Sequence, residues 1–207
     1  NQHQGKLEDH QIPVPVQSVV CLSTTHFAYF DAVGESDKVK GAVNISYSLD
    51  STLLNAVEQG KVEDVTSGGE LHQEKALKIA PELVLVYPFG NQSYNKITTA
   101  GIPVLNITEY LEQSPLAKTE WIKLIGLLTG KEKSADNQFN NTAMAYDSLK
   151  RLAENRFKNA PCTFLNMPFK KTWNMPSGNS YAASLLSDAG YRYLYQDQKS
   201  EGNLTME

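Results

Sequence analysis

The feature that most constrains the fold is a long run without proline or glycine, from about Glu132 to Phe157. Apolar side chains recur along it at helical spacing, at Ala135, Phe139, Ala143, Tyr146, Ala153 and Phe157. A helix over this run would be about 40 Å long at ~1.5 Å per residue. Because that exceeds what one small lobe needs, the run predicts a helix that connects two lobes.

Before this run, apolar strands alternate with helical stretches. We expect strands at 16–22, 37–43, 82–88 and 102–107, and helices at 26–33, 50–60, 71–81, 93–101 and 114–130. Asp50 or Ser51 would cap the second helix, and Ser114 would cap the last, with Pro115 in its first turn. Repeated strand–helix–strand order indicates an α/β lobe with a largely parallel sheet covered on both faces.

After the run, the alternation restarts. The sequence predicts a strand at 160–169, a loop at 170–180, a helix over 180–190 and a strand at 191–196. We therefore expect an N-terminal extension (1–16), an N-terminal lobe (17–130), a connecting helix (131–158) and a partial C-terminal lobe (159–207). The second lobe would expose much of its apolar surface, which suggests that the chain ends before its fold does. Such an open edge favours strand exchange or dimerisation.

Composition excludes some classes of protein. The net charge of −4 over 207 residues gives no sign of a nucleic-acid-binding face. No apolar run approaches the roughly 20 residues of a membrane span, and no signal peptide is visible, so the chain begins like a mature or trimmed protein. The two cysteines, Cys21 and Cys162, are expected to be buried free thiols.

Three segments carry a resemblance to a known family. They are "VVCLSTTHFAYFDAVGESDKVKGAV" (19–43), "LHQEKALKIAPELVLV" (71–86) and "WNMPSGNSYAASLLSDAGYRYL" (173–194). With the long helix between two α/β lobes, they resemble the helical-backbone periplasmic substrate-binding proteins of ABC importers, which carry ferric siderophores, haem or cobalamin. The middle segment is the most specific, although Glu82 stands where the family usually has Asp.

The resemblance implies two Rossmann-like lobes with parallel sheets, joined by a backbone helix, the second lobe being incomplete here. It implies a periplasmic or otherwise extracytoplasmic protein, with or without a lipid anchor, that delivers its ligand to the permease subunits of an ABC importer. The bound ligand would be a ferric siderophore, haem or cobalamin, with no catalytic cofactor. A stiff helix between the lobes would allow only a small closure.

Four polar residues follow the first strand: Ser23, Thr24, Thr25 and His26. Thr24 or Thr25 is expected to cap the next helix. The carboxyl ends of parallel strands are where α/β sheets bind ligands, so we predict that this segment contacts the ligand.

Aromatic residues follow three predicted strands: Tyr47, Phe89 and Trp173. The resemblance places them, together with Asn174, on the wall of the ligand site, where flat apolar surface suits macrocycles and chelates. Trp121 belongs to a helical face and is expected in the core.

Glu74 stands where the family has an acidic residue that docks onto arginines of the permease. A solvated carboxylate near a helix N-terminus explains the same residue. The resemblance favours docking. Its counterpart on the second lobe would lie at or beyond Glu207.

Two other functions stay open. A metal-ion (Zn, Mn or Fe) binding protein of related architecture would need His26 as a ligand, yet only His3, His10 and His72 could join it and no metal-ligand spacing is present. An α/β hydrolytic enzyme would need a nucleophile and a base, but Cys21 lies inside a strand and no Gly-x-Ser-x-Gly or phosphate-binding loop occurs.

Overall fold

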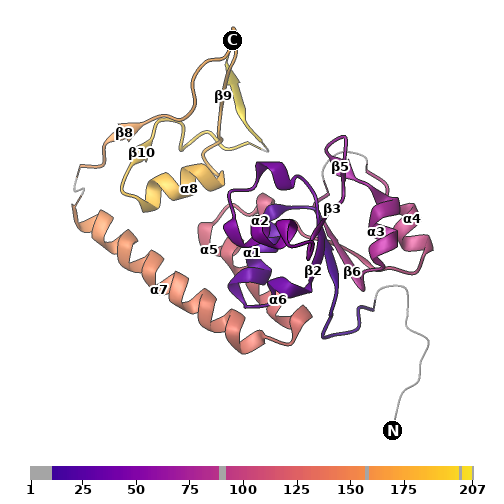
Figure 1. Cartoon of the computed structure of the whole chain (residues 1–207). Helices are drawn as coiled ribbons and strands as arrows, with labels where there is room; N and C mark the ends of the chain where they lie inside the picture. Colours follow the sequence, from indigo (N-terminus) through magenta and orange to yellow (C-terminus); the bar gives the residue numbers. More distant parts are fainter. Residues whose placement is uncertain (1–10, 89–91, 157–158, 201, 207) are drawn as a thin grey trace. The chain divides into compact units, whose positions relative to one another are not determined.

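The computed structural model describes residues 11–88, 92–156, 159–200 and 202–206. These residues divide into two compact units (Figure 1). Unit 1 comprises residues 1–108 and 122–138, and unit 2 comprises residues 109–121 and 139–207. Residues 109–121, which the sequence analysis assigned to the first lobe, thus group with unit 2.

A parallel five-stranded sheet forms the centre of unit 1. Its strands run in the order β3-β2-β1-β6-β7. Their bounds are β1 Val19–Cys21, β2 Val39–Ala42, β3 Glu63–Asp64, β6 Leu83–Val86 and β7 Val104–Asn106. The order reverses between β1 and β6, which is the topological switch point of doubly wound sheets.

Helices cover both faces of this sheet (Figure 1). Unit 1 contains α1 Thr24–Ala32, η1 Ser36–Lys38, η2 Ile45–Tyr47, α2 Ser51–Glu58, α3 Gln73–Ile79, α4 Asn95–Thr99 and α6 Ile122–Thr129, with a small hairpin of β4 Thr66–Ser67 and β5 Glu70–Leu71. α1 and α6 lie on one face, and α3 and α4 on the other. The predicted α/β fold with a parallel sheet is confirmed.

Apolar side chains at every second position of the strands form a core on one face of the sheet in unit 1. Val20 of β1 and Val84 and Val86 of β6 pack with Ala76 of α3 and Ile97 of α4 in one buried cluster. Gly41 lies under α3, and an added Cβ there would stand 2.9 Å from Cδ1 of Ile79, the end of a flexible side chain on that helix. A larger residue at this position would therefore require the Ile79 side chain to move.

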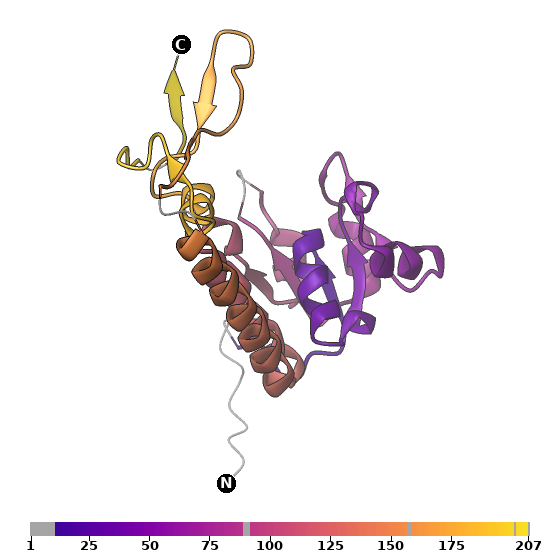
Figure 2. The ribbon, with the colours of Figure 1, turned by 90° about the vertical axis from the view of Figure 1, so that its left-hand side faces the viewer.

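Helix α7 (Glu132–Arg156) is continuous, as the sequence predicts (Figure 2). At its start in unit 1, Ala135 packs against Gly126 of α6, and a Cβ on Gly126 would lie 2.5 Å from that of Ala135. The part from Phe139 onward belongs to unit 2.

Unit 2 adds η3 Glu109–Leu111, α5 Pro115–Glu120, β8 Cys162–Thr163, β9 Trp173–Met175, α8 Tyr181–Asp188, β10 Arg192–Tyr193 and β11 Leu204–Met206. β8 and β10 pair in parallel, and β9 pairs with β11 in antiparallel orientation. α8 is fixed to α7 by Asp188, which accepts a 2.8 Å hydrogen bond from Oη of Tyr146 and forms a 2.8 Å ion pair with Lys150. The Asp188 carboxylate raises the pKa of Lys150, while desolvation and, after it, the hydrogen bond to Asp188 raise the pKa of Tyr146.

Three expectations for local structure are wrong. The helix expected over 114–130 is two helices, α5 and α6, separated at Trp121, whose Nε1 donates to Glu112 (3.0 Å). The strand expected over 160–169 stops at Thr163, because the backbone of Asn166 turns at φ 64° and Pro168 has no N–H to donate. The loop expected over 170–180 contains β9.

The cysteines are free, as predicted, but differ in environment. Cys21 is buried, and burial raises the pKa of its thiol. Cys162 is exposed, which corrects the expectation that both are buried. Within the part of the chain that the structure describes, no helix has the length and apolar character needed to cross a bilayer.

His26 is fully buried in helix α1. Desolvation lowers the pKa of its imidazole from 6.5 to about 4, against a smaller opposing effect of a hydrogen bond with the backbone of Leu85. The folded state therefore holds His26 neutral over a pH range in which the unfolded chain binds a proton.

Unit 1 should consequently lose stability as the pH falls from about 6.5 to 4. Since the unfolded state binds more protons there, the free energy of unfolding should decrease by up to about 3 kcal/mol from this group. Urea unfolding between pH 4 and 7 measures the effect, and His26→Leu should flatten that pH dependence. His72→Asn is the control, because Asn can still cap α3 and His72 lies outside the core. An unchanged pH dependence in His26→Leu would contradict the assignment.

Candidate functional site

The segment after β1 lies at the switch point of the sheet. Ser23 follows β1 by two residues and caps α1, and its Oγ accepts a hydrogen bond from the backbone N of Thr25 at 3.2 Å. The cap is therefore Ser23 rather than Thr24 or Thr25. This frees the two threonine hydroxyls from the capping role that the sequence analysis gave to one of them.

Neighbouring strand ends are tied to this segment by backbone hydrogen bonds. Leu22 N donates to Leu85 O at 2.9 Å, and Val43 N donates to Cys21 O at 3.2 Å. The loops after β1, β2 and β6 therefore leave the sheet at one edge. Ser23, Thr24 and Thr25 are half-buried at this edge. The imidazole of His26 instead points into the core, so a ligand cannot reach it without a local rearrangement.

Of the two aromatic residues expected near this edge, the structure describes Tyr47. It lies in η2, after β2, and 84% of its surface is exposed. Its position is set by Asn44, which adopts a left-handed backbone (φ 58°) and accepts a hydrogen bond from Tyr47 N at 3.0 Å. The predicted contact Phe89 lies outside the described residues. The edge thus combines half-buried hydroxyl side chains with one exposed aromatic ring.

Trp173 and Asn174 lie in β9 of unit 2 rather than in a loop. The indole is half-buried, donates from Nε1 to Leu165 O (3.3 Å) and stands edge-to-face against Phe164, with ring centroids 5.4 Å apart. Asn174 is exposed, and its Oδ1 accepts from Thr205 Oγ1 at 3.0 Å across the β9–β11 pair. Both residues therefore belong to an ordered strand, which fixes the direction of their side chains.

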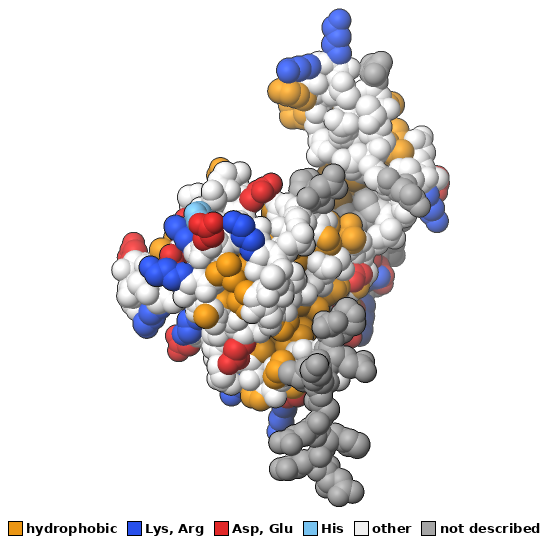
Figure 3. Space-filling view, turned by 90° about the vertical axis from the view of Figure 1, so that its right-hand side faces the viewer, with side chains coloured by type: hydrophobic (Ala, Val, Ile, Leu, Met, Phe, Trp, Pro, Cys, Tyr) orange, Lys and Arg blue, Asp and Glu red, His pale blue; other side chains and the backbone are white. Residues whose placement is uncertain are grey.

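Glu74 lies in the first turn of α3 and is exposed. Lys96 of α4 donates to its carboxylate at 3.0 Å, and this contact holds the pKa of Glu74 below its usual range. His72 caps the same helix by accepting from Lys75 N through Nδ1 (3.3 Å). Figure 3 shows a histidine among acidic and basic side chains on this face. Glu74 is ionised and accessible, as docking would require.

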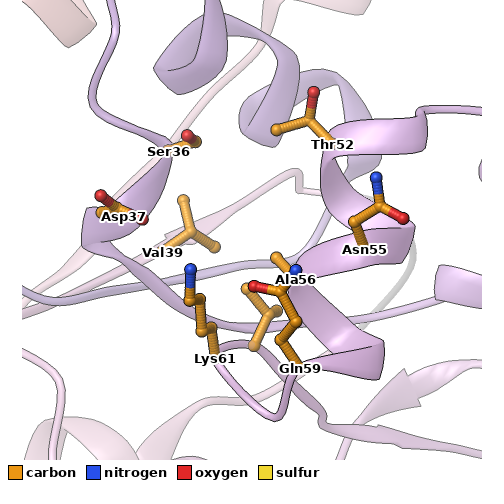
Figure 4. A pocket seen from close by; sticks show the side chains of 9 residues that line it. Ser36, Asp37, Val39, Thr52, Asn55, Ala56, Gln59 and Lys61 are labelled. Carbon is orange, nitrogen blue, oxygen red and sulfur yellow. The ribbon is translucent and has the colours of Figure 1, made fainter.

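One small pocket of unit 1 includes none of the residues of the segment after β1 (Figure 4). It is lined by residues of η1, α2 and the segment after α2, including Asp37, Asn55 and Lys61. Its volume of about 250 Å³ is below the ~300–1,000 Å³ of typical ligand pockets. The pocket is therefore too small for the chelates that the sequence predicts.

Among residues 11–88, 92–156, 159–200 and 202–206, no three His, Cys, Asp or Glu side chains are grouped so as to hold a metal ion. This finding covers the described residues alone. For the whole chain, the absence of a metal site remains a prediction.

The sequence analysis did not single out the segment between β8 and β9. It forms an ordered hairpin that exposes Met167, Phe169, Lys170 and Lys171 next to Trp173. The signal in the sequence was "NMPFKK", two large apolar residues around a proline followed directly by two lysines. A single strand over 160–169, as the sequence predicts, would place these side chains on alternate faces.

Curated relatives include an uncharacterized lipoprotein of Methanocaldococcus jannaschii, 28% identical over 203 residues. The match covers 93% of this chain and 48% of the relative. The chain spans about half the length of the curated relatives that it matches.

Solved structures share the fold. A possible iron-binding (periplasmic solute-binding) protein of Staphylococcus epidermidis superposes with a TM-score of 0.73 at 16% identity, covering 93% of this chain and 72% of that one. The triscatecholate siderophore binding protein of Bacillus subtilis, complexed with ferri-bacillibactin, gives a TM-score of 0.69 at 17% identity, covering 96% and 68%. At these identities the likeness shows the fold alone.

The model of the periplasmic binding protein family matches residues 19–205. That range includes the sheet of unit 1, helix α7 and the strands of unit 2. The members of this family are solute-binding proteins rather than enzymes. The chain belongs to the periplasmic binding protein family.

Proposed function

We propose that this chain belongs to the substrate-binding component of an ABC importer and captures a ferric siderophore, haem or cobalamin. The observation that carries the proposal is the family match over residues 19–205, in a chain with the expected parallel sheet and long helix. The mechanism is binding and release, without catalysis. The protein works outside the cytoplasm, and the lipoprotein names of its relatives support a lipid anchor.

The ligand contacts in this proposal come from both units. In unit 1, Ser23, Thr24 and Thr25 offer hydroxyl groups and the first turn of α1, and Tyr47 offers an exposed ring. In unit 2, Trp173 and Asn174 offer an indole and an amide on an ordered strand. We also propose Phe89 as a ligand contact. His26, predicted as a contact, is fully buried in the core of unit 1 and is not one of the proposed contacts.

Helix α7 would act as the spacer between the two halves of the site. It is 25 residues long and contains neither proline nor glycine, so it has no point at which helices usually kink. We propose that ligand binding changes the angle between the units only slightly. Large closure on binding would contradict this part of the mechanism.

The binding function is tested by titrating the protein with haem, cobalamin and a panel of ferric siderophores while following tryptophan fluorescence. One ligand should quench the emission saturably, because Trp173 is half-buried beside the proposed site. Trp173→Phe should remove most of the quenching. Trp121→Phe is the matched control, since Trp121 is equally half-buried in unit 2 but is held by Glu112.

A response to free Zn²⁺ or Mn²⁺ in place of every chelate would favour the metal-ion function. No change in fluorescence with any ligand, or quenching that is lost in Trp121→Phe, would contradict the proposal.

We propose that Glu74 contacts the permease. Its exposed, ionised carboxylate would pair with an arginine of the partner, and its exposed pair with Lys96 is weak enough to exchange. Glu74→Gln should lower ligand uptake by about tenfold in reconstituted vesicles, in line with the loss of one interfacial charge pair, while ligand affinity stays unchanged. Glu70→Gln, an exposed carboxylate of the neighbouring β5, is the control. Equal uptake by the two variants would refute the docking role.

We also propose that the chain self-associates through unit 2. Phe164 and Leu194, which directly follow the two strands of its parallel sheet, are about half exposed, whereas parallel sheets are normally covered on both faces. Leu185 and Tyr191 are exposed in the same unit. A second copy would cover this apolar surface.

Light scattering over a wide concentration range tests this association. We expect the mass to rise with concentration, and Leu194→Lys to keep the chain monomeric because it places a charge on the apolar surface. A chain that is strictly monomeric at all concentrations would refute it.

A further inference from the structure

The hairpin between β8 and β9 is a defined structural element. Phe169 and Thr172 exchange two backbone hydrogen bonds, of 2.8 and 3.1 Å, around a turn formed by Lys170 and Lys171. Lys170 adopts a left-handed backbone (φ 58°), a conformation that Gly or Asn usually supplies in such turns. The lysine at this position therefore adopts a backbone conformation that is unfavourable for its residue type.

The side chains at this tip are unusual for an exposed turn. Met167 is 82% and Phe169 is 74% exposed, and Lys170 and Lys171 are exposed beside them. Nζ of Lys170 lies 5.4 Å from the centre of the Phe169 ring, within the range of a cation–π contact. In Figure 3, lysine and hydrophobic side chains gather at the end of unit 2. The hairpin therefore presents apolar surface and positive charge together.

The stretch of sequence that contains the hairpin carries charge of one sign. Residues 155–187 contain no Asp or Glu, although the chain as a whole carries a net charge of −4. The turn therefore presents two adjacent lysines with no carboxylate nearby in sequence, and adjacent cations favour an anionic ligand.

The base of the hairpin is built from the proposed ligand contacts. Trp173 donates to Leu165 O, and its ring meets Phe164 edge-to-face. Asn166 Nδ2 donates to Asn174 O at 2.7 Å, so the turn at Asn166 and the strand at Asn174 are joined directly. The proposed contacts Trp173 and Asn174 thus follow the hairpin directly in the chain, and hydrogen bonds join them to its base.

We propose that the hairpin of residues 166–172 selects anionic chelates that carry flat aromatic or macrocyclic surface. Lys170 and Lys171 pair with the anionic groups, and Phe169 and Met167 pack against the flat surface. This inference rests on the proposed binding function and narrows its ligand. Two candidate ligands share the chemistry: a ferric tris-catecholate, whose phenolate charges exceed that of Fe(III), and haem, whose propionates are ionised.

The test compares these anionic ligands with a ferric tris-hydroxamate and with cobalamin, neither of which carries net negative charge. Affinities are measured by fluorescence titration at low and high salt. We expect one anionic ligand to bind at least about tenfold more tightly than both uncharged ones, with an advantage that shrinks as salt screens the lysines. Saturation by the tris-catecholate would identify phenolates as the anionic groups, and saturation by haem would identify propionates.

Variants assign the selectivity to the hairpin. K170Q/K171Q should weaken binding of the anionic ligand about tenfold and leave the uncharged ligands unchanged. K133Q/K199Q, at two exposed lysines elsewhere, is the matched control and should have no effect. Phe169→Ser should weaken binding at every salt concentration, because it removes packing rather than charge. Circular dichroism establishes that each variant is folded.

Two results overturn the inference in distinguishable ways. If the hydroxamate or cobalamin binds as tightly as the anionic ligands, or if K170Q/K171Q equals its control, the selectivity is wrong and the binding function stands. If no chelate binds, the proposed function fails and the inference fails with it.

Discussion

The structure of unit 1 depends on the pairing of β1 with two parallel neighbours. Val19, Val20 and Cys21 are completely buried, with β2 on one side and β6 on the other. Because every strand in the sheet runs in the same direction, their following loops emerge at one edge. The order of the strands then decides which loops are neighbours, so the polar segment after β1 and the loop after β6 flank the switch point. The location of the candidate site in unit 1 follows from this pairing.

Elements with strong local signals could be predicted from the sequence. The buried run at 83–86, the capped helix after Asp50 and the long helix over 132–156 each have a pattern that only one local structure satisfies. The polar segment after the first strand could be located for the same reason, because a strand that leads directly into a helix places it at a sheet edge.

The remaining features depend on partners distant in the sequence. β9 pairs with β11, and Thr205 of β11 lies opposite Asn174. Neither segment has a short sequence pattern that predicts this pairing. The break between α5 and α6 occurs in a good helical sequence, at a residue whose indole bonds to Glu112. The burial of His26 could not be predicted, because four polar residues in succession carry no signal that distinguishes their exposure. The strand ends at Cys21 and Ser23 caps α1, so His26, three residues after the cap, lies on the side of the helix that faces the core.

The division of the chain into units has a consequence for dissecting the protein. Three connections, after Thr108, Trp121 and Gln138, lead from one unit to the other. Neither unit is therefore a continuous stretch of sequence. Any single cut produces fragments in which one unit lacks some of its own residues or keeps residues of the other, so the two halves are not separable modules that could be exchanged by simple fusion.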